Sequence, residues 1–410
     1  MIGTVPCLVP DPSYWKSLWR RRLDDYLEVT DTRIRFMEKE AAQGDILPRT
    51  RARLLRIIEA KSSERTRIQE LFMDLRAGSQ QMSRSVVPAQ PESLGGRLAV
   101  LEWYEHVFRD WAWGEPESTR LAALVTRLVA RKIDFLAVYG AGAGRLAFDV
   151  HASLSPNHTL ALDLNPLPLL IAERLIRGES LELDEFPVSP TTERRMVVRQ
   201  RLEAPSIANE GLQFAFADAL EPPLRAGTVD AILTPWFVDS IPLDLRETLA
   251  IINRALRPGG HWIQIGPLNF NTVLSRTYLI EEVLELTERA GFRVLSHFEE
   301  RVPYFDSPFS GSWREETLYC LAAEKVTEAP PFLARAKVPP WVADPDQPIP
   351  IDSELIAMAR TSAFTTMVMS LIDGTQSISD IAASLAERVG MDRNDLKGQL
   401  RAFFGKVPVA

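Results

Sequence analysis

The sequence has little cysteine, no long apolar run and no excess of positive charge. Its two cysteines, Cys7 and Cys320, lie far apart and form no CxxC pair, which argues against a disulfide framework and a cysteine zinc site. No run of about 18 apolar residues occurs, so no segment is predicted to span a bilayer. The first residues lack a basic region followed by an apolar stretch, so we expect no secretory signal and a reducing, cytoplasmic setting.

The net charge and the spacing of the histidines argue against two further classes, nucleic-acid-binding proteins and metalloproteins. A formal net charge of −8 argues against nucleic acid as a partner, because binding phosphates requires a basic face. The five histidines show no HxH or HxxxH spacing, so we predict no metal site. The 410 residues, of which 46% are hydrophobic, are typical of a globular protein with two or three domains.

Changes in composition divide the chain into four regions. Residues 1–96 have apolar residues at helical spacings followed by a polar stretch with prolines and glycines, which predicts a helical region and a linker. Residues 97–328 contain short apolar strands alternating with helices, the pattern of an α/β domain with a parallel sheet. Residues 329–350 contain seven prolines and are predicted to be a linker, and 351–410 to form a small helical module.

Short apolar runs predict seven strands in the α/β region. A polar insertion at residues 178–210 separates the second strand from the third. This rhythm predicts one doubly wound sheet closed by a terminal hairpin. The predicted strands are 135–140, 159–164, 212–217, 229–236, 261–266, 292–304 and 317–326.

Three glycines alternate in the stretch AVYGAGAGRLAFDV, between the first predicted strand and a helix. Gly140, Gly142 and Gly144 let the backbone approach a ligand and aim the free N–H groups of the helix at it. Read from Gly142, the turn passes the relaxed GxGxxA form of the dinucleotide motif, and the absence of a following GK[ST] excludes a P-loop. The turn alone leaves three interpretations open: a nicotinamide cofactor, S-adenosylmethionine, or tight packing without a ligand.

Acidic and aromatic residues follow the next strands. Asp163 ends the second strand, where it can accept hydrogen bonds from both hydroxyls of a ribose. Asp218 and Ala219 follow the third strand, where a carboxylate can meet an adenine amino group beside an apolar wall. Trp236 ends the fourth predicted strand and Phe237 follows it, and both are predicted to form apolar walls near the cofactor and the substrate.

The order of these features resembles the class I S-adenosylmethionine-dependent methyltransferases. A glycine turn, a ribose acid, an adenine acid and a PGG turn before the fifth strand follow one another as in that fold. The additional hairpin strand is also typical of it and not of dehydrogenases. The resemblance implies a Rossmann-like seven-stranded sheet that binds S-adenosyl-L-methionine along the turn.

Four stretches carry a closer resemblance, to the carnosine N-methyltransferase family, also called N2227-like. They are FRDWAWGEPES (108–118), GAGAGRLAFDV (140–150), WFVDSIP (236–242) and HWIQIGPLNFN (261–271). The resemblance implies methyl transfer to the imidazole of a small histidine-containing peptide.

Asp239 is the candidate catalytic residue. It follows the fourth strand at the edge where open α/β sheets bind ligands. A carboxylate that accepts a hydrogen bond from one imidazole N–H would fix the tautomer and stabilise the developing imidazolium. In the resembling family the matching aspartate contacts the imidazole. The alternative is that Asp239 caps a helix beginning at residue 242.

Arg145 directly follows the glycines and can reach the carboxylate of the cofactor with its planar fork. Its alternative role is a surface ion pair. Trp111 and Trp113 are predicted either to form a lid or to pack the helical region on the core.

The acceptor side departs from the family. The family carries a histidine where this chain has Asn271, and tyrosines where this chain has SGSWREETLY. The resemblance therefore predicts the methyl donor of this protein, but it does not predict the identity of the acceptor. Asn271 is predicted to hydrogen-bond the substrate and Trp313 to stack on a ring.

The stretch LIDGTQSISDIAASLAERVG (371–390) resembles the PqqD-like modules, or RiPP recognition elements, which are winged-helix-like and bind leader peptides. The β-hairpin usual in such modules is hard to find in 340–364. A dimerisation or stabilising role for this module stays open.

Three functions stay open at this point. The first is N-methylation of a histidine-containing small molecule or peptide, including a precursor peptide held by the C-terminal module. The second is a cofactor-binding scaffold without turnover, and the third is O-methylation of a small metabolite. A homodimer stays open, whereas no nucleic-acid or membrane partner is expected.

Overall fold

The computed structural model describes residues 1–76, 104–129, 131–208, 210–241, 243–270, 274–330, 346–348, 367–368, 370–389 and 391–404. The chain divides into two compact units. One contains 1–79 and 97–332, and the other contains 80–96 and 333–410. The predicted linker at 77–96 and most of the proline-rich segment lie outside the described residues.

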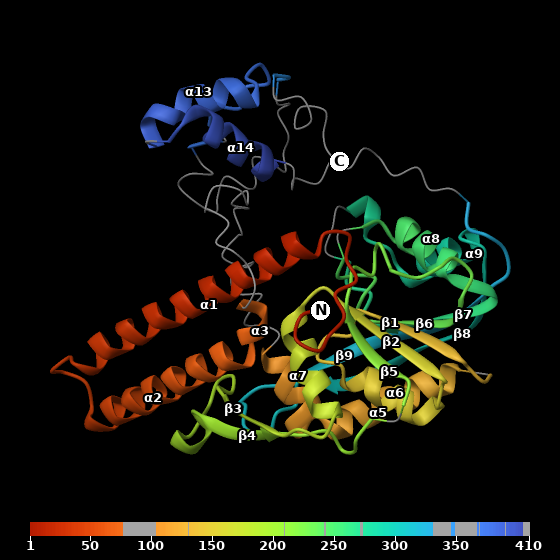
Figure 1. The fold of residues 1–410 in the computed structure, drawn as a ribbon, viewed down its shortest axis with the longest axis horizontal. Coiled ribbons are helices and arrows are strands. Elements are labelled where there is room, and N and C mark those ends of the chain that lie inside the picture. Colours follow the sequence, from red (N-terminus) through yellow and green to blue (C-terminus); the bar gives the residue numbers. More distant parts are fainter. Residues whose placement is uncertain are drawn as a thin grey trace. The chain divides into compact units, whose positions relative to one another are not determined.

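A seven-stranded sheet with the order β5-β2-β1-β6-β7-β9-β8 forms the centre of the first unit (Figure 1). Strands β5, β2, β1, β6 and β7 run parallel, and β9 is antiparallel to both β7 and β8. This is the strand order of the class I methyltransferase fold, so the predicted fold class is confirmed. The strands are β1 (Phe135–Tyr139), β2 (His158–Asp163), β5 (Leu212–Phe216), β6 (Val229–Pro235), β7 (Leu256–Gly266), β8 (Phe292–Tyr304) and β9 (Arg314–Lys325).

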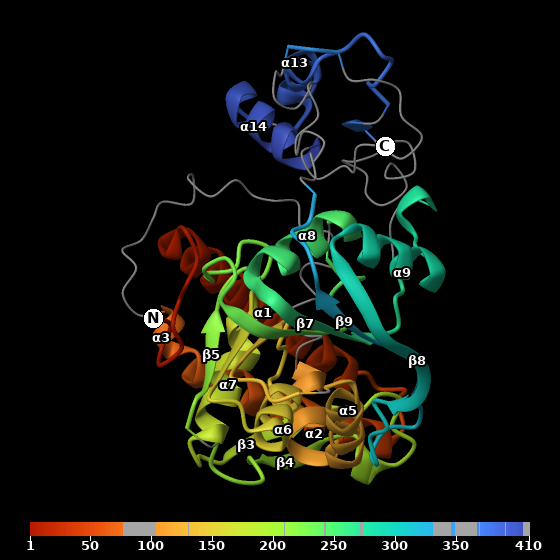
Figure 2. The same cartoon turned by 90° about the vertical axis from the view of Figure 1, so that its right-hand side faces the viewer.

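Helices cover both faces of the sheet (Figure 2). One face carries α5 (Glu115–Leu128), α6 (Arg145–Leu154) and α7 (Pro166–Ile176), and the other carries α8 (Leu245–Ala255) and α9 (Ile280–Arg289).

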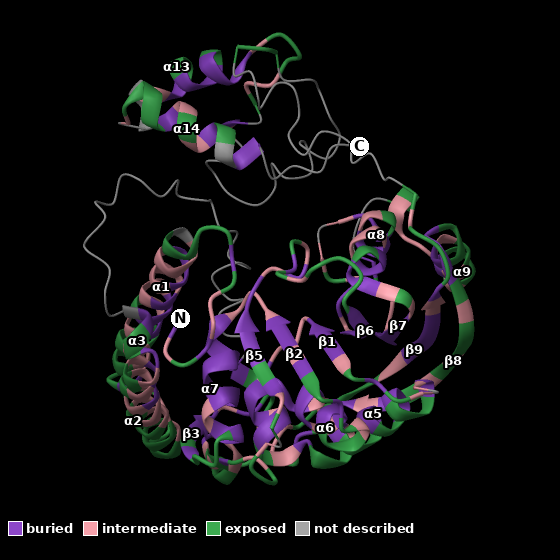
Figure 3. Cartoon of the chain, turned by 45° about the vertical axis from the view of Figure 1, so that its right-hand side comes forward, coloured by how far each residue is buried: buried purple, intermediate pink, exposed green. Residues whose placement is uncertain are grey.

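Side chains alternate between the two faces along β1. Leu136 and Val138 belong to one buried cluster, and Ala137 and Tyr139 belong to the other. Burial on both faces explains why the strands read as continuous apolar runs in the sequence (Figure 3).

The N-terminal helices pack in the same core as α5, α6 and α7. They are α1 (Pro12–Ala41), α2 (Pro48–Leu71) and α3 (Met73–Arg76), and their buried residues include Leu23 and Ile68. Ahead of α1, the chain pairs with the edge of β5, since the Leu8 N–H donates to the Phe216 carbonyl at 2.8 Å. This pairing covers backbone groups that an edge strand would otherwise expose.

The polar insertion contains a β-hairpin that the sequence did not predict. Strands β3 (Leu181–Glu185) and β4 (Val198–Leu202) pair antiparallel in a sheet of their own, with the short helix η2 (Glu193–Arg195) in the connection. β3 contacts α2, so the insertion connects the N-terminal helices with the α/β region.

Two helices dominate the described part of the second unit. α13 (Ile378–Val389) and α14 (Arg393–Phe404) bury apolar residues against each other. Ser377 and Asp380 hydrogen-bond reciprocally at the start of α13, which is a capping arrangement. The module is helical as expected, whereas its likeness to PqqD-like modules stays a prediction.

None of the helices in the described ranges has the length and apolar character that crossing a membrane would require.

Candidate functional site

The glycine turn has the backbone that its sequence demands. Gly140, Gly142 and Gly144 have φ values of +73°, +56° and +88°. A Cβ on Gly140 would lie 2.8 Å from the Phe237 ring, and one on Gly144 would lie 2.7 Å from the Phe214 ring. A Cβ on Gly142 would meet nothing within 4 Å. Two of the glycines are therefore required by packing, and Gly142 faces space that a ligand can enter.

Asp163 joins the end of β2 to this turn. Its Oδ2 accepts a hydrogen bond from the Gly142 N–H at 2.7 Å, and its Oδ1 accepts one from the Asn165 N–H at 2.8 Å. Burial raises the pKa of the Asp163 carboxyl. Each carboxylate oxygen has a further lone pair, so the group can still accept from two hydroxyls. The structure thus brings the turn and the predicted ribose acid together.

Asp218 lies at the end of the neighbouring strand β5. Its Oδ1 accepts from the Leu220 N–H at 2.8 Å, and the Ala217 N–H donates to the Asp163 carbonyl at 3.1 Å. Ala219 is buried beside it. The two predicted acids therefore follow adjacent strands of the sheet.

Trp236 and Phe237, which follow β6, contact different parts of the protein. Trp236 donates from Nε1 to Oε2 of Glu316 at 2.8 Å, and its ring lies 5.5 Å from that of Tyr304. Phe237 is buried against Gly140 and makes an edge contact with Tyr139. Phe237 thus supports the glycine turn, while Trp236 faces β8 and β9. Their roles towards cofactor and substrate stay predictions.

Asp239 has one satisfied and one unsatisfied oxygen. Its Oδ2 accepts from the Asn269 N–H at 2.7 Å, which joins the exits of β6 and β7. Its Oδ1 is buried and has no hydrogen-bond partner in the part of the chain that the structure describes. A buried polar atom without a partner is rare, and it marks a place where a ligand can bind.

The interpretation of Asp239 as a helix cap is wrong. Helix α8 begins at Leu245 and not at residue 242, and its N-cap is Asp244, whose side chain accepts from the Arg246 N–H. The proline that suggested an earlier start lies outside the described residues.

Bulky residues with positive φ follow three parallel strands. Trp236, Leu268 and Phe305 have φ values of +46°, +55° and +56°, and they follow β6, β7 and β8. β8 runs parallel to β7 because both are antiparallel to β9, so the three lie at the same edge of the sheet. Each such conformation costs on the order of 1–3 kcal/mol, and they concentrate at functional sites.

Arg145 is enclosed within the protein. Its Nε donates to both oxygens of Asp149 at 2.9 and 3.0 Å, and its Nη1 donates to the Asp110 carbonyl at 2.9 Å. This is the ion pair of the alternative interpretation, but buried rather than on the surface. The Nε and Nη1 groups are thus engaged within the protein, and a role of Arg145 towards the cofactor stays a prediction.

Trp111 and Arg109 belong to the π-helix η1 (Arg109–Trp113) beside the turn. The indole of Trp111 donates to the Ala143 carbonyl at 2.7 Å, so it packs against the turn. Arg109 donates to Asp110 at 2.8 Å and lies about 5 Å from the rings of Tyr304 and Phe305. Arg109 was not predicted as a cation at this site, because the sequence shows it only as one residue of the FRDWAW stretch.

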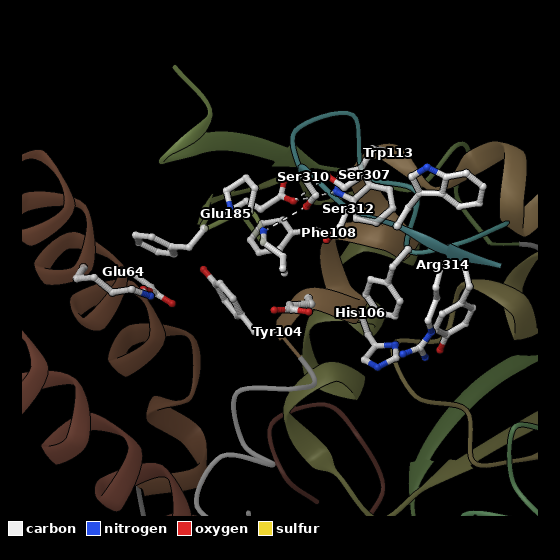
Figure 4. A pocket seen from close by; sticks show the side chains of 18 of the residues that line it. Glu64, Tyr104, His106, Phe108, Trp113, Glu185, Ser307, Ser310, Ser312 and Arg314 are labelled. Atoms are coloured by element: carbon white, nitrogen blue, oxygen red, sulfur yellow. Dashed lines mark hydrogen bonds and ion pairs between the residues drawn. The ribbon is translucent and has the colours of Figure 1, made fainter. Parts of the chain in front are cut away.

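A cavity of about 760 Å³ lies apart from the glycine turn. Figure 4 shows Glu64 on the side of the long helices, His106 and Arg314 on the other side, and Glu185 between them. Trp313 lines the cavity with 59% of its surface exposed, whereas Asn271 lies outside the described residues. The lining comes from α1, α2, residues 104–113, the end of β3 and residues 304–314; it includes Arg33, Lys61, Tyr104, Trp113, Phe186, Tyr304, Phe305 and Ser307.

Within the described ranges, no group of three or more histidine, cysteine or acidic side chains could hold a metal ion.

Comparisons with known proteins return methyltransferases. No family model matches the chain. It is 26% identical over 194 residues to a carnosine N-methyltransferase of Dictyostelium discoideum, which covers 43% of this chain and 41% of that protein. The chain thus matches less than half of the length of this relative.

Solved structures with low similarity include two methyltransferases. An S-adenosylmethionine-dependent methyltransferase of Methanosarcina mazei has 14% identity and a TM-score of 0.35, over 50% of this chain and 98% of that one. An N-methyltransferase of Bradyrhizobium japonicum in complex with S-adenosyl-L-homocysteine has 14% identity and a TM-score of 0.35, over 54% and 98%. At this similarity they add nothing to the topology described above.

Proposed function

We propose that this protein is an S-adenosylmethionine-dependent N-methyltransferase that acts on an imidazole or amine nitrogen of a histidine-containing acceptor. One observation carries the proposal. Asp163 is hydrogen-bonded to a glycine turn that is open at Gly142, and Asp239 holds an unpaired buried oxygen at the same edge of the sheet. The 26% identity to a carnosine N-methyltransferase supports the choice of acceptor.

The residues at the turn fit the proposed cofactor. Gly142 leaves the close approach free, Asp163 would hold the ribose hydroxyls, and Asp218 would accept from the adenine amino group. Ala219 and Trp236 would form apolar walls. When bound, S-adenosylmethionine supplies an electrophilic methyl group on a positively charged sulfur.

Asp239 would act on the acceptor. Its Oδ1 can accept a hydrogen bond from one ring N–H of an imidazole, which leaves the lone pair of the other nitrogen free to attack. The same carboxylate stabilises the positive charge that develops on the ring during transfer. A neutral imidazole already has a lone pair, so no strong base is required. The buried residues Phe237 and Val238 exclude water at this point of the chain.

The test separates cofactor binding from methyl transfer. Titration calorimetry measures the affinity for S-adenosylmethionine, and a tritiated-methyl assay measures transfer to histidine-containing peptides. We expect Asp239→Ala to lower kcat by about 100-fold or more while the cofactor affinity stays within about threefold of wild type. Asp239→Asn keeps the shape of the side chain but not its charge, so its kcat should lie between those of wild type and Asp239→Ala. Glu221→Gln, an exposed acid after β5, is the control for a lost charge.

Two outcomes would contradict the proposal. If Asp239→Ala abolishes cofactor binding, Asp239 holds the loop at Asn269 and has no catalytic role. If the wild-type protein binds the cofactor but transfers methyl to none of the peptides, the scaffold or another acceptor class replaces the proposed activity.

A further inference from the structure

Two neighbouring acids at the end of β3 have different environments. Asp184 is buried and pairs with Arg199 through both carboxylate oxygens, at 2.9 and 3.0 Å. Glu185 is 6% exposed and lines the cavity. It accepts from Gln200 at 2.6 Å and from Trp113 and Ser307 at 3.3 Å, all of them neutral donors. Among the described residues, no cation pairs with Glu185.

A buried carboxylate without a counter-charge is costly, because the desolvation of its charge is not offset by a partner. Burial raises the pKa of Glu185, and the negative charge of nearby Glu105 raises it further. The two long hydrogen bonds at 3.3 Å compensate only in part. A cationic group entering the cavity would supply the missing charge.

Three cationic side chains line the cavity, and none of them pairs with Glu185 among the described residues; two of them, Lys61 and Arg314, have other partners, and the third is Arg33. Lys61 donates to Glu64 at 2.7 Å and lies over the ring of Phe186. Arg314 pairs with Glu316 at 2.8 Å and lies 4.6 Å from the centre of the Tyr304 ring. These contacts also show that aromatic rings in this wall accept cations on their faces.

The cavity adjoins the exit of β6. Tyr304 lines the cavity and contacts the ring of Trp236, three residues before Asp239. Arg314 pairs with the same Glu316 that accepts from the Trp236 indole. A cavity of about 760 Å³ lies in the range that encloses drug-sized ligands and exceeds the size of one imidazole. It therefore suits a longer acceptor.

We propose that this cavity binds a peptide segment of the acceptor that carries an ammonium or guanidinium group, with Glu185 as its counter-ion. The assignment of the peptide as a methyl acceptor rests on the proposed function, whereas the binding of the cation does not. The cation can come from a lysine or arginine side chain or from the peptide N-terminus. The chemistry at Glu185 is the same in each case.

The experiment measures binding without cofactor, by fluorescence anisotropy of labelled peptides with a central histidine. One series places lysine, or its uncharged analogue norleucine, at each position around the histidine. A second series compares free with acetylated N-termini and so separates the two sources of the cation. For lysine at one of these positions, or for the free N-terminus, we expect wild type to bind the charged peptide about tenfold more tightly than its uncharged counterpart. This ratio is equivalent to about 1.4 kcal/mol.

Glu185→Gln should reduce that ratio to near one, because glutamine keeps the shape of the side chain and removes its charge. Glu182→Gln on the same strand is the matched control, since Glu182 is exposed and does not line the cavity. It should leave the ratio unchanged. Comparing charged with uncharged peptides within each variant cancels any loss of folded protein.

The inference is overturned if wild type prefers no charged peptide in either series, or if Glu185→Gln keeps the preference. The same peptides are then assayed for methyl transfer with S-adenosylmethionine. A charge preference without transfer contradicts the proposed function alone, and transfer without a charge preference contradicts this inference alone.

Discussion

The glycine-turn edge and the cavity belong to the same compact unit but are assembled differently. The turn edge is built where β1, β2 and β5 end, and its acids accept hydrogen bonds from backbone N–H groups. In the cavity, the described donors to Glu185 are all side chains, which come from the π-helix, from β4 and from the turn after β8. Local chain geometry thus fixes the first site, and distant elements must meet to form the second.

The two sites also differ in how easily a substitution removes the hydrogen-bond donors of their acids. A backbone donor remains after any substitution except proline, whereas each side-chain donor around Glu185 can be lost in one step. We therefore expect the turn edge to be sensitive to changes in shape and the cavity to be sensitive to changes in charge. The predictions below test this contrast, beginning with the largest expected effect.

The largest effect concerns the turn. Gly144→Ala should lower the free energy of unfolding by about 2–5 kcal/mol, because its φ of +88° is strained for alanine and its Cβ would overlap the Phe214 ring. Gly142→Ala should cost only about 1–2 kcal/mol, since only its φ is unfavourable. Urea unfolding measures both.

Titration with S-adenosylmethionine completes this test. Gly142→Ala should fold and yet lose about tenfold or more of its cofactor affinity, because the new methyl group occupies the open space. If both variants unfold equally, or if Gly142→Ala binds the cofactor like wild type, the turn does not make the close approach that we infer.

The second effect is a pH dependence at the boundary between the two sites. Burial raises the pKa of Glu117 to about 7, while Arg109 opposes the shift; the Phe305 N–H donates to Oε2 of Glu117 at 3.2 Å. Between the unfolded pKa of about 4.3 and this value, the folded protein retains a proton that the unfolded chain releases. The contribution of Glu117 to stability therefore falls as pH rises through this window, by up to about 4 kcal/mol.

This prediction is checked as a difference between variants. The stability of wild type relative to Glu117→Gln should decline between pH 5 and pH 8, as measured by urea unfolding at each pH. Glu115→Gln, an exposed acid on the same helical turn, should show no such trend. A flat difference for Glu117 would show that its carboxyl titrates normally.

The smallest effect concerns Arg145. Arg145→Lys keeps the charge but loses the guanidinium that reaches Asp149 through Nε and the Asp110 carbonyl through Nη1, so we expect stability to fall by about 1–2 kcal/mol. Cofactor affinity should stay within about threefold of wild type if Arg145 remains in its internal ion pair. A tenfold loss of affinity at nearly unchanged stability would instead assign Arg145 to the cofactor carboxylate.

The strands and the turn edge could be predicted because their signals are local. Strands buried on both faces read as continuous apolar runs, and a glycine turn with an acid on the next strand is visible in one stretch of sequence. The fifth strand was predicted from His261, and the structure extends it back to Leu256. The structure confirmed the sheet and shows Asp163 hydrogen-bonded to the Gly142 N–H, whereas its role towards a ribose stays a prediction.

Other features gave no readable signal. The hairpin of β3 and β4 has the sequences LELDE and VRQRL, whose many charges resemble a surface loop. Asp244 rather than Asp239 caps α8, and both lie before the same helix in the sequence. Glu185 has no cationic partner among the described residues, and a sequence does not show which side chains come close to it in the fold.

The sequence by itself determined the apolar runs that form the strands, the left-handed glycines of the turn and the acids that follow consecutive strands. Each of these depends on backbone sterics and on hydrogen bonds between residues close along the chain or on neighbouring strands. Only the tertiary structure decided that Arg145 pairs internally and that, among the described residues, Oδ1 of Asp239 has no hydrogen-bond partner and Glu185 has no cation. Partnership and solvation of a charge depend on every element packed around it, and the packing is settled only when the chain is folded.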